Sequence, residues 1–439
     1  MQVLHFPRIM SMASTSVWDR LPQDEQRYIN EQADKLLLSS QYTRELTNGA
    51  ADLHMWDEGP LAVLLDPIVN ACLTNRPKGT QTNARIMKAF RASMDHLRSS
   101  EFDYRSAVPH KPLHHKQVYV DQHTRDVTIL GRCPVEGEQT RCCRLMTLDA
   151  VRQCGYGCSY CSIRSFYDEH RMYIYPDLPR RLKQLELDPE RIYHIGTGQS
   201  SDSLMFGSRK GSLDALLEFA QAHPNVILEL KTKSDHVQSL TARSSSIPSN
   251  VITTWSLNPQ VIIDHEEHFT APLHQRIKAA RSVADAGGLV GFHFHPILKY
   301  RGWREDYQEI IEIVQRTFSP QETVMVSLGT LTFTRAVIRK LRESGIKTKV
   351  LRMPMDEIAG KYSYPLSVKL ELFRHVYGCF AEEWKQQVYF YLCMEDPSLW
   401  QPVFGQSYED NNAFESDMLT AYMHRISRHR EFREAHARR

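Results

Sequence analysis

The chain has 439 residues, the size of two or three domains or of one large barrel with extensions. Hydrophobic residues make up 41% of it, enough for a sizeable buried core. With 54 basic and 52 acidic residues the formal charge is +2, so global charge predicts no partner, and nucleic-acid binding would need a local basic patch.

Nine cysteines are present, and five of them fall between positions 142 and 161. An odd, clustered set is typical of reduced thiols that act as ligands rather than of a secreted disulfide framework. The N-terminal stretch lacks a long apolar run, and no stretch reaches about 18 uninterrupted apolar residues. We therefore expect no signal peptide, no membrane span and a cytoplasmic location.

Residues 1–120 are expected to form an N-terminal helical extension. Apolar residues recur there with a period of about 3.6 in the segments 24–40 and 84–97, which predicts helices. No chemical motif is found in this region, so it is interpreted as a packing extension, with a partner surface as the alternative.

The segment 121–345 alternates short β-branched runs with amphipathic runs. Strands are predicted at 143–151, 191–197, 225–232, 251–257, 288–297 and 322–330, and helices at 177–187, 212–223, 271–287, 304–318 and 335–345. This alternation predicts an α/β fold with a parallel sheet, an open or closed (β/α) barrel. Ligands of such folds bind at the C-terminal ends of the strands.

Residues 346–439 are expected to form a C-terminal extension. A further helix is predicted at 361–378 and a strand at 388–396, and the chain ends in a basic tail at 424–439. A solvated helix end is the favoured interpretation of that tail, and binding of nucleic acid or phosphate is the alternative.

One short loop after the first predicted core strand carries Cys154, Cys158 and Cys161 with C-x3-C-x2-C spacing. Three thiolates can hold three irons of a 4Fe–4S cluster and leave the fourth iron open, whereas most such clusters take four cysteines. In radical S-adenosylmethionine (SAM) chemistry the open iron binds the amino and carboxylate groups of SAM. The loop therefore predicts a radical SAM site; structural zinc would need a fourth ligand from elsewhere.

The next strand ends carry residues suited to SAM. Gly196 and Gly198 end the second strand and let the backbone approach the methionyl part of the cofactor. Lys233 is a candidate partner for the SAM carboxylate, and Ser256 and Asn258 are candidate hydrogen-bonding residues. The alternative for each is an ordinary polar residue at a strand end.

These motifs resemble the spore photoproduct lyase family and its lyase-like relatives. The matching stretches, in the family's order, are CGYGCSYCSI, HIGTGQSSDSL, LELKTKSDHV, TTWSLNPQVI, HEEHFTAPLHQRIKAA, GFHFHPILKYRGWREDY, SLGTLTF and YLCMED. The resemblance covers about 120–400 and implies a partial (β/α)6 barrel of the radical SAM type between the two extensions. It places the cluster on the three cysteines, and SAM near Tyr160, Ser201, Asp202, Lys233, Ser256 and Asn258.

The chain departs from the family pattern at the expected reaction centre. The family's lyase reverses a thymine–thymine lesion in spore DNA, and a cysteine and tyrosines return the hydrogen atom. Here the cysteine position is Gln199 and the tyrosine position after the third cysteine is Ser162, although Tyr160 is retained. Lyase-like relatives commonly have Glu at Gln199, Asp at His295 and Arg at Thr332. These replacements favour a reaction other than DNA repair.

A second thiol group lies just before the first barrel strand, in Arg141-Cys142-Cys143-Arg144. Flanking arginines are expected to lower the pKa of such thiols, and thiolates bind soft species such as zinc, copper(I) or trivalent arsenic. The alternative is that both cysteines are small strand residues, one of them buried.

His293 and His295 are two residues apart on one predicted strand, so both side chains face the same side of the sheet. Such a pair can bind metal or act as acid and base, and the alternative is a pair of hydrogen-bonded residues in the barrel lumen.

We therefore expect a radical SAM enzyme, a lyase or transferase, that reductively cleaves SAM at a 4Fe–4S cluster to act on a small molecule. Flavodoxin or ferredoxin is the expected electron donor. Three alternatives stay open. They are a DNA photoproduct repair lyase, transfer of the aminocarboxypropyl group of SAM to a thiophilic substrate such as arsenite, and a non-enzymatic scaffold protein that binds an iron–sulfur cluster or is stabilised by zinc. The candidate catalytic residues are Tyr160, Gln199, Cys142, Cys143, His293 and His295, with the arsenite held by the two cysteines.

Overall fold

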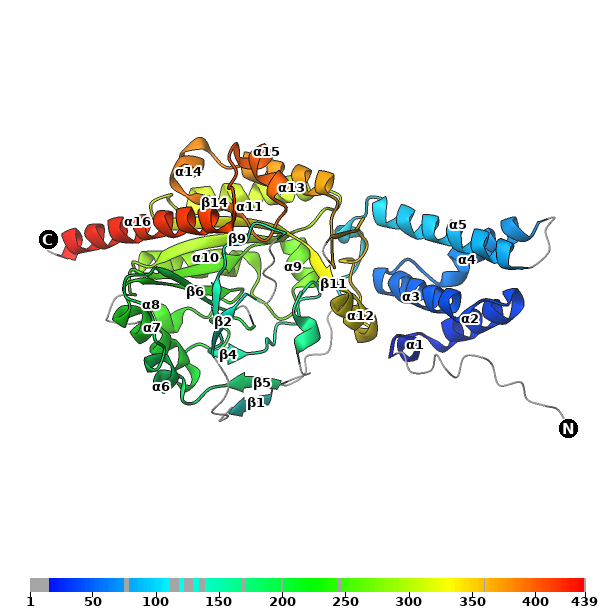
Figure 1. The fold of residues 1–439 in the computed structure, drawn as a ribbon, viewed down its shortest axis with the longest axis horizontal. Helices are drawn as coiled ribbons and strands as arrows, with labels where there is room; N and C mark the ends of the chain where they lie inside the picture. The colour runs from blue at the N-terminus through cyan, green and yellow to red at the C-terminus, as the bar shows by residue number, and fades with distance from the viewer. Residues whose placement is uncertain are drawn as a thin grey trace.

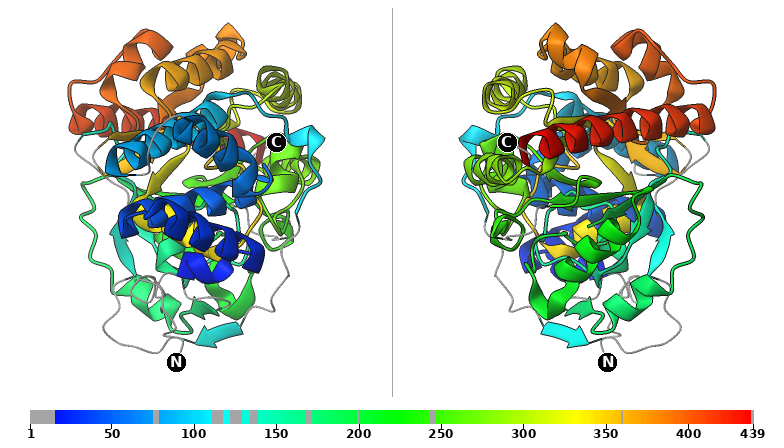
Figure 2. Two further views of the ribbon diagram at one scale, coloured as in Figure 1. Left: turned by 90° about the vertical axis from the view of Figure 1, so that its right-hand side faces the viewer. Right: turned by 90° about the vertical axis from the view of Figure 1, so that its left-hand side faces the viewer.

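The computed structural model describes residues 16–74, 79–110, 118–121, 129–133, 139–167, 171–198, 200–242, 247–358 and 360–437. The N-terminal helices form one end of the molecule, the barrel lies in the middle, and the long C-terminal helix projects at the other end (Figure 1). Seen along the long axis, the N-terminal helices lie over one end of the barrel (Figure 2). Among the described residues, no helix is both long and apolar enough to span a membrane.

The core is an eight-stranded sheet in the order β14-β10-β9-β8-β7-β6-β3-β2. All neighbours from β3 to β14 are parallel, and only β2 is antiparallel, to β3. Its strands are β2 (Leu130–Arg132), β3 (Met146–Leu148), β6 (Tyr193–Thr197), β7 (Val226–Thr232), β8 (Val251–Ser256), β9 (Leu289–Ile297), β10 (Thr323–Thr330) and β14 (Tyr389–Leu392). The strands β3 and β6–β10 confirm the partial (β/α)6 barrel. They are nearly continuous apolar runs because helices cover the outer face of a parallel sheet.

The barrel helices connect these strands. They are α6 (Leu178–Lys183), α7 (Ser212–Ala222), α8 (Gln238–Thr241), α9 (Gln260–Glu266), α10 (Leu273–Asp285), α11 (Trp303–Thr317) and α12 (Arg335–Ser344). The helices predicted at 212–223, 271–287, 304–318 and 335–345 are confirmed. The helix predicted at 177–187 is shorter, because α6 ends before the polar segment that leads into β6.

The predicted first strand, 143–151, is in fact two strands in different sheets. Its first half is β3 of the barrel, and the chain then turns into β4 (Val151–Arg152). That strand joins β1 (Val118–Asp121) and β5 (Arg171–Ile174) in a small sheet of order β1-β5-β4. The cysteine loop therefore follows β4, and the strands before and after it, β4 and β5, both belong to this small sheet.

The N-terminal extension consists, in its described part, of α1 (Ser16–Arg20), α2 (Gln23–Leu36), α3 (Ser40–Trp56), α4 (Leu61–Leu73) and α5 (Thr80–Ser99). Helices α2 and α5 confirm the two that were predicted. One hydrophobic core runs through these helices, the barrel and the C-terminal segment, so the segments pack as one body. The boundaries at 120 and 345 stay predictions.

The C-terminal segment adds to the barrel. It contains β12 (Asp356–Ile358) and β13 (Lys361–Ser363), which form a sheet with β11 (Thr332–Thr334), and then α13 (Leu366–Gly378), α14 (Glu382–Gln387), α15 (Trp400–Phe404) and α16 (Asn411–Ala437). Helix α16 buries Phe414, Met418, Tyr422 and Ile426, one side chain per turn. The basic tail is not wholly solvated, because Arg433 donates to the carbonyl of Ile247 at 2.7 Å.

A buried carboxylate fastens α3 to α12. Asp52 is 1% exposed and accepts bonds from Arg342 Nε at 2.7 Å and Nη2 at 2.8 Å, and from Arg98 Nη2 at 3.2 Å. Next to it, Thr348 N donates to the carbonyl of Met55 at 2.9 Å. Removing one partner of a buried charge pair costs more than the pair contributes, because the remaining charges lose their compensation.

We expect Asp52→Asn to lower the free energy of unfolding by about 2–4 kcal/mol, since two guanidinium groups then share a neutral amide. Urea denaturation followed by circular dichroism measures this. Asp34→Asn, on the exposed face of α2, is the matched control and should change stability by less than about 0.5 kcal/mol. Equal effects of the two variants would show that Asp52 does not fasten the extension.

Candidate active site

The cysteine loop lies at the C-terminal ends of the barrel strands and lines a cavity of about 260 Å³. Cys154, Cys158 and Cys161 all face this cavity. The amide of Cys161 donates to the carbonyl of Cys158 at 3.2 Å, and Gly157 has φ +64°, which only glycine adopts without strain. Burial raises the pKa of Cys154 and Cys158, the latter to about 12.

Two adjacent buried glutamates hold the cysteine loop in place through hydrogen bonds. Glu266 accepts a bond from the Ser159 hydroxyl, and its own carbonyl accepts from the Ser159 amide at 2.9 Å. The same carboxylate accepts from Tyr104 OH at 2.7 Å, from Lys349 N at 3.0 Å and from the Thr348 hydroxyl. Glu266 thus joins the loop to the N-terminal extension and to the segment after α12.

Glu267 supports the next residue of the loop. Its carboxylate accepts bonds from the Tyr160 hydroxyl, from Asn258 Nδ2 at 2.7 Å and from Arg276 Nη2 at 2.5 Å. Burial alone raises the pKa of Glu267, but the charges of Arg276 and Lys233 outweigh burial and lower it to about 2. Glu267 is therefore an anion, and it orients Tyr160, whose ring lies 5.8 Å from Lys233 Nζ.

Most of the residues predicted to bind SAM line the same cavity. They are Tyr160, Gly198, Ser201, Asp202, Lys233 and Ser256. Gly196 and Asn258 lie outside the lining. Gly196 makes room for Leu145, since a Cβ there would lie 2.9 Å from its side chain. Asn258 instead bridges Glu267 and Tyr307, whose hydroxyl donates to Asn258 Oδ1 at 2.9 Å.

Asp202 holds the loop after β6 against the end of β7. Its carboxylate accepts from Thr232 Oγ1 at 2.7 Å and from Lys233 N at 2.6 Å, as well as from the amides of Leu204 and Met205. Gly198 permits this close approach, because it has φ +84° and a Cβ there would lie 2.6 Å from the carbonyl of Lys231. Gln199, the next residue, lies outside the described residues.

His293 and His295 both line the cavity, which confirms that they share the lumen face. His293 Nε2 is 2.7 Å from Glu229 Oε1, and its Nδ1 is 2.5 Å from Ser327 Oγ. Burial, with Lys231, lowers the pKa of His293 to about 4, so the neutral ring donates to Glu229 and accepts from Ser327. Burial likewise lowers the pKa of His295, whose ring packs against Gly329.

Sequence reasoning missed Glu229, Tyr391 and Cys393, which also line the cavity. Glu229 lies inside β7, where only the strand end had been considered. Tyr391 lies in β14 and Cys393 directly follows it. The rule that ligands bind at strand ends could have found Cys393, had β14 been counted as a barrel strand.

Cys142 and Cys143 also line the cavity of the cysteine loop. The expectation that the flanking arginines lower the thiol pKa is wrong for Cys143: the hydrogen bond with Cys142, burial and Cys393 raise it. The arginines turn away, Arg141 to the carbonyl of Tyr408 at 3.1 Å and Arg144 to residues at the start of α16. Both thiols are therefore placed in the chamber, and Cys143 is a neutral thiol.

The donor set fits a 4Fe–4S cluster with SAM. Three soft thiols face one cavity, and the buried Ser201 hydroxyl in its wall has no hydrogen-bond partner among the described residues. Among the described residues, no three His, Cys, Asp or Glu side chains are arranged to hold a single metal ion. A cluster differs from such a site, because each of the three thiolates binds a different iron. The cluster would be held by Cys154, Cys158 and Cys161.

Comparison with known proteins agrees with this geometry. The sequence profile described as spore photoproduct lyase matches residues 153–378, just over half of the chain. A spore photoproduct lyase from Geobacillus sp. (strain Y412MC61) is 26% identical over 219 residues, which cover 47% of this chain and 61% of that protein. One from Clostridium acetobutylicum is 23% identical over 224 residues, 49% of this chain and 64% of that protein. The matched parts thus span less than two thirds of these relatives.

Among solved structures, a spore photoproduct lyase complexed with dinucleoside spore photoproduct superposes with a TM-score of 0.52. It shares 20% sequence identity, and the alignment covers 62% of this chain and 82% of that one. At this identity the match shows the fold.

Fold and site together define the class of protein, a partial (β/α)6 barrel of the radical SAM type with its three-thiol loop at the C-terminal end of the strands. Within that class, the chain belongs to the spore photoproduct lyase family.

We expect Glu267→Gln to lower the free energy of unfolding at pH 7 by on the order of 3 kcal/mol, since Arg276 loses its charged partner. The pKa of Glu267 is about 2 in the folded chain, below its ordinary 4.5, so its contribution is complete above pH 4.5 and is lost as the pH falls toward 2. The stability difference between wild type and variant should therefore shrink over that range.

Denaturant unfolding of the metal-free protein at a series of pH values measures this difference. Glu190→Gln, at an exposed position, is the control and should show no such trend. A difference for Glu267→Gln that stays constant from pH 5 to pH 2.5 would contradict the assigned ionisation.

Proposed function

We propose that this protein is a radical SAM enzyme that cleaves SAM reductively and acts on a small molecule enclosed in the barrel. The observation that carries the proposal is that the three cluster thiols, six SAM candidates and two buried histidines line one cavity at the strand C-termini. When bound, the cluster and SAM supply one-electron cleavage of a sulfonium carbon–sulfur bond. Flavodoxin or ferredoxin is the proposed electron source.

The protein's own residues hold and shield this chemistry. Glu266 and Glu267 fix the thiol loop and Tyr160, and Asp202 fixes the wall that presents Ser201. Lys233 brings a positive charge to the cavity, where it suits the SAM carboxylate. Neutral His295 and the apolar parts of the lining reduce the access of water, which suits a reactive radical.

A small substrate is favoured by the way the barrel is closed. The amide of Arg141, just before β3, donates to the carbonyl of Glu395, just after β14, at 2.9 Å. This bridge joins the two ends of the curled sheet. Cys142 and Cys393, which are next to the bridged residues in sequence or nearly so, both line the cavity there. The cavity among the described residues, about 260 Å³, is below the usual range for small-ligand pockets and must also take up SAM, so it leaves no room for a large substrate.

The alternative, a DNA photoproduct repair lyase, is supported by family membership and by the dinucleoside photoproduct bound to a relative. Against it, Ser162 faces the cavity at the position where the family pattern has a tyrosine, and a serine hydroxyl does not supply a phenol's hydrogen atom. Conversion of a lesion-containing dinucleotide by the reconstituted enzyme would favour this alternative.

Replacing Cys154, Cys158 or Cys161 by Ala should abolish the 4Fe–4S absorbance and SAM cleavage, because each removes one of only three ligands on the loop. The assay is anaerobic incubation with SAM and dithionite, with mass spectrometry of the SAM fragments. Cys72→Ala, on α4 outside the cavity, is the control and should keep both properties. Wild-type protein that forms no cluster and cleaves no SAM would refute the proposed function.

The vicinal thiols support a second candidate, transfer of the aminocarboxypropyl group of SAM to a thiophilic substrate such as arsenite. Cys142 and Cys143 line the cavity shared with the cluster loop. Arsenous acid condenses with neutral thiols and releases water, so a raised thiol pKa does not oppose its capture as it opposes zinc binding.

If arsenite is the substrate, the Cys142→Ser/Cys143→Ser variant should lose arsenite-dependent SAM turnover and keep its iron content. Methylthioadenosine should then replace deoxyadenosine as the SAM fragment in the wild type. Cys379→Ser, a half-buried thiol outside the chamber, is the control. Unchanged turnover in the double variant, or deoxyadenosine as the sole fragment, would remove this candidate.

A further inference from the structure

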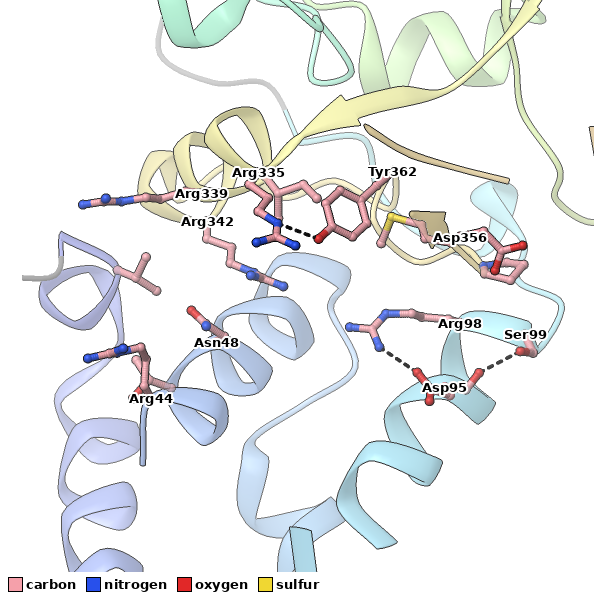
Figure 3. Close-up of a pocket in the computed structure, with 15 residues that line it drawn as sticks. Arg44, Asn48, Asp95, Arg98, Ser99, Arg335, Arg339, Arg342, Asp356 and Tyr362 are labelled. Atoms are coloured by element: carbon pink, nitrogen blue, oxygen red, sulfur yellow. Dashed lines mark hydrogen bonds and ion pairs between the residues drawn. The ribbon is translucent and has the colours of Figure 1, made fainter. Parts of the chain in front are cut away.

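A second cavity, of about 930 Å³, lies between the N-terminal extension and α12 (Figure 3). Helices α3 and α5 form one side of it, and α12 with β12 and β13 forms the other. None of its lining residues belongs to the cavity of the cysteine loop. Nothing in the proposed chemistry uses it.

We propose that this cavity binds the phosphate groups of a nucleotide-containing ligand. Five arginines line it, Arg44, Arg98, Arg335, Arg339 and Arg342, against two aspartates, Asp95 and Asp356. Guanidinium groups match phosphate oxygens in geometry and charge, and they are more weakly hydrated than ammonium groups. Arginines from two separate parts of the chain thus contribute to one concave surface.

Three of these arginines converge. Figure 3 shows the guanidinium groups of Arg98, Arg335 and Arg342 pointing toward one another across the cavity, with Asn48 beside them. Asp52, a buried carboxylate outside the lining, accepts from both Arg98 and Arg342 and offsets part of the repulsion among the three charges. A multivalent anion in the cavity would offset it further.

Carboxylates outside the cavity lining orient these arginines. Some guanidinium N–H groups remain available for a ligand. Arg342 uses Nε and Nη2 on Asp52, and Arg335 uses Nε on Tyr362 and Nη2 on Glu357. Among the described residues, neither Nη1 group makes a further hydrogen bond. Asp52, Glu343 and Glu357, which pair with Arg342, Arg339 and Arg335, do not line the cavity. The arginines are thus neutralised from outside the lining, and their remaining N–H groups are what the cavity offers to a ligand.

The cavity is too large for phosphate alone. Val17, Ile338, Met355 and the ring of Tyr362 add apolar surface to the lining, which suits the flat face of a base. A free nucleotide and a single-stranded nucleic acid share this chemistry of phosphate plus base. The proposed site recognises a phosphate group together with a base. The experiment below distinguishes a free nucleotide from a single-stranded nucleic acid.

The test uses the cluster-reconstituted full chain without SAM, so its outcome does not depend on turnover. The probes are ATP, measured by calorimetry, and a fluorescein-labelled twelve-nucleotide oligothymidylate, measured by anisotropy. We expect at least one to bind, with an association constant that falls as salt rises, by a log–log slope of about −0.7 for each oligonucleotide phosphate neutralised.

The Arg335→Gln/Arg339→Gln variant should weaken binding about tenfold or more, because each arginine supplies a charged donor. Both side chains are exposed, 75% and 67%, so the variant is expected to fold, and thermal melting checks this. Arg180→Gln is the matched control, an exposed arginine on α6 that pairs with Asp177, and its affinity should equal that of the wild type.

ATP binding alone would assign the site to free nucleotides, and oligonucleotide binding that ATP does not compete away would assign it to nucleic acid. Both results support the phosphate site when the double variant is impaired. Absence of binding for both probes, or equal affinity in wild type and double variant, would overturn it. Failure of SAM cleavage would leave this result unaffected, so the two proposals fail separately.

Discussion

The buried pair Glu266–Glu267 is the interaction on which the rest of the site depends. Packing of Tyr156 and Tyr160 holds part of the loop that carries the three thiols, and hydrogen bonds with this pair of glutamates hold the residues between the cysteines. Glu266 supplies them to Ser159 and Glu267 to Tyr160, the two residues between the second and third cysteine. Buried carboxylates are costly unless they are fully bonded. Here Arg276 and the hydroxyl and amide groups around both glutamates donate hydrogen bonds that offset the free-energy cost of burying the carboxylates.

The same pair explains why the N-terminal helices belong to this barrel. Tyr104, which follows α5, donates to Glu266, and so does Lys349 N from the segment after α12. That segment is in turn held by α3 through Asp52 and the carbonyl of Met55. The extension therefore contacts the carboxylate that shapes the cysteine loop, and it is more than a separate packing unit.

Much of the site could be predicted because its signals are local. The spacing of Cys154, Cys158 and Cys161 and the alternation of strands and helices identify the loop and the barrel. Contacts that are distant in the sequence could not be read in this way. Nothing local shows that Arg141 bridges to Glu395, so the meeting of Cys142 with Cys393 was missed. The pKa of Cys143 was misjudged because sequence neighbours were taken as spatial neighbours, whereas Arg141 and Arg144 turn toward α16.

The short ribbon of β11 and β13 separates the two cavities and belongs to both. Leu331 and Thr332 line the chamber of the cysteine loop, whereas Arg335 and Tyr362 line the arginine cavity. The ribbon is fixed at its inner end, where Ser363 Oγ donates to the carbonyl of Leu331 at 2.6 Å. Thr330, just before it, donates to Glu395, the residue whose carbonyl closes the barrel. The reaction chamber and the arginine cavity are therefore lined by neighbouring residues of one hydrogen-bonded ribbon, which Glu395 ties to the closure of the barrel.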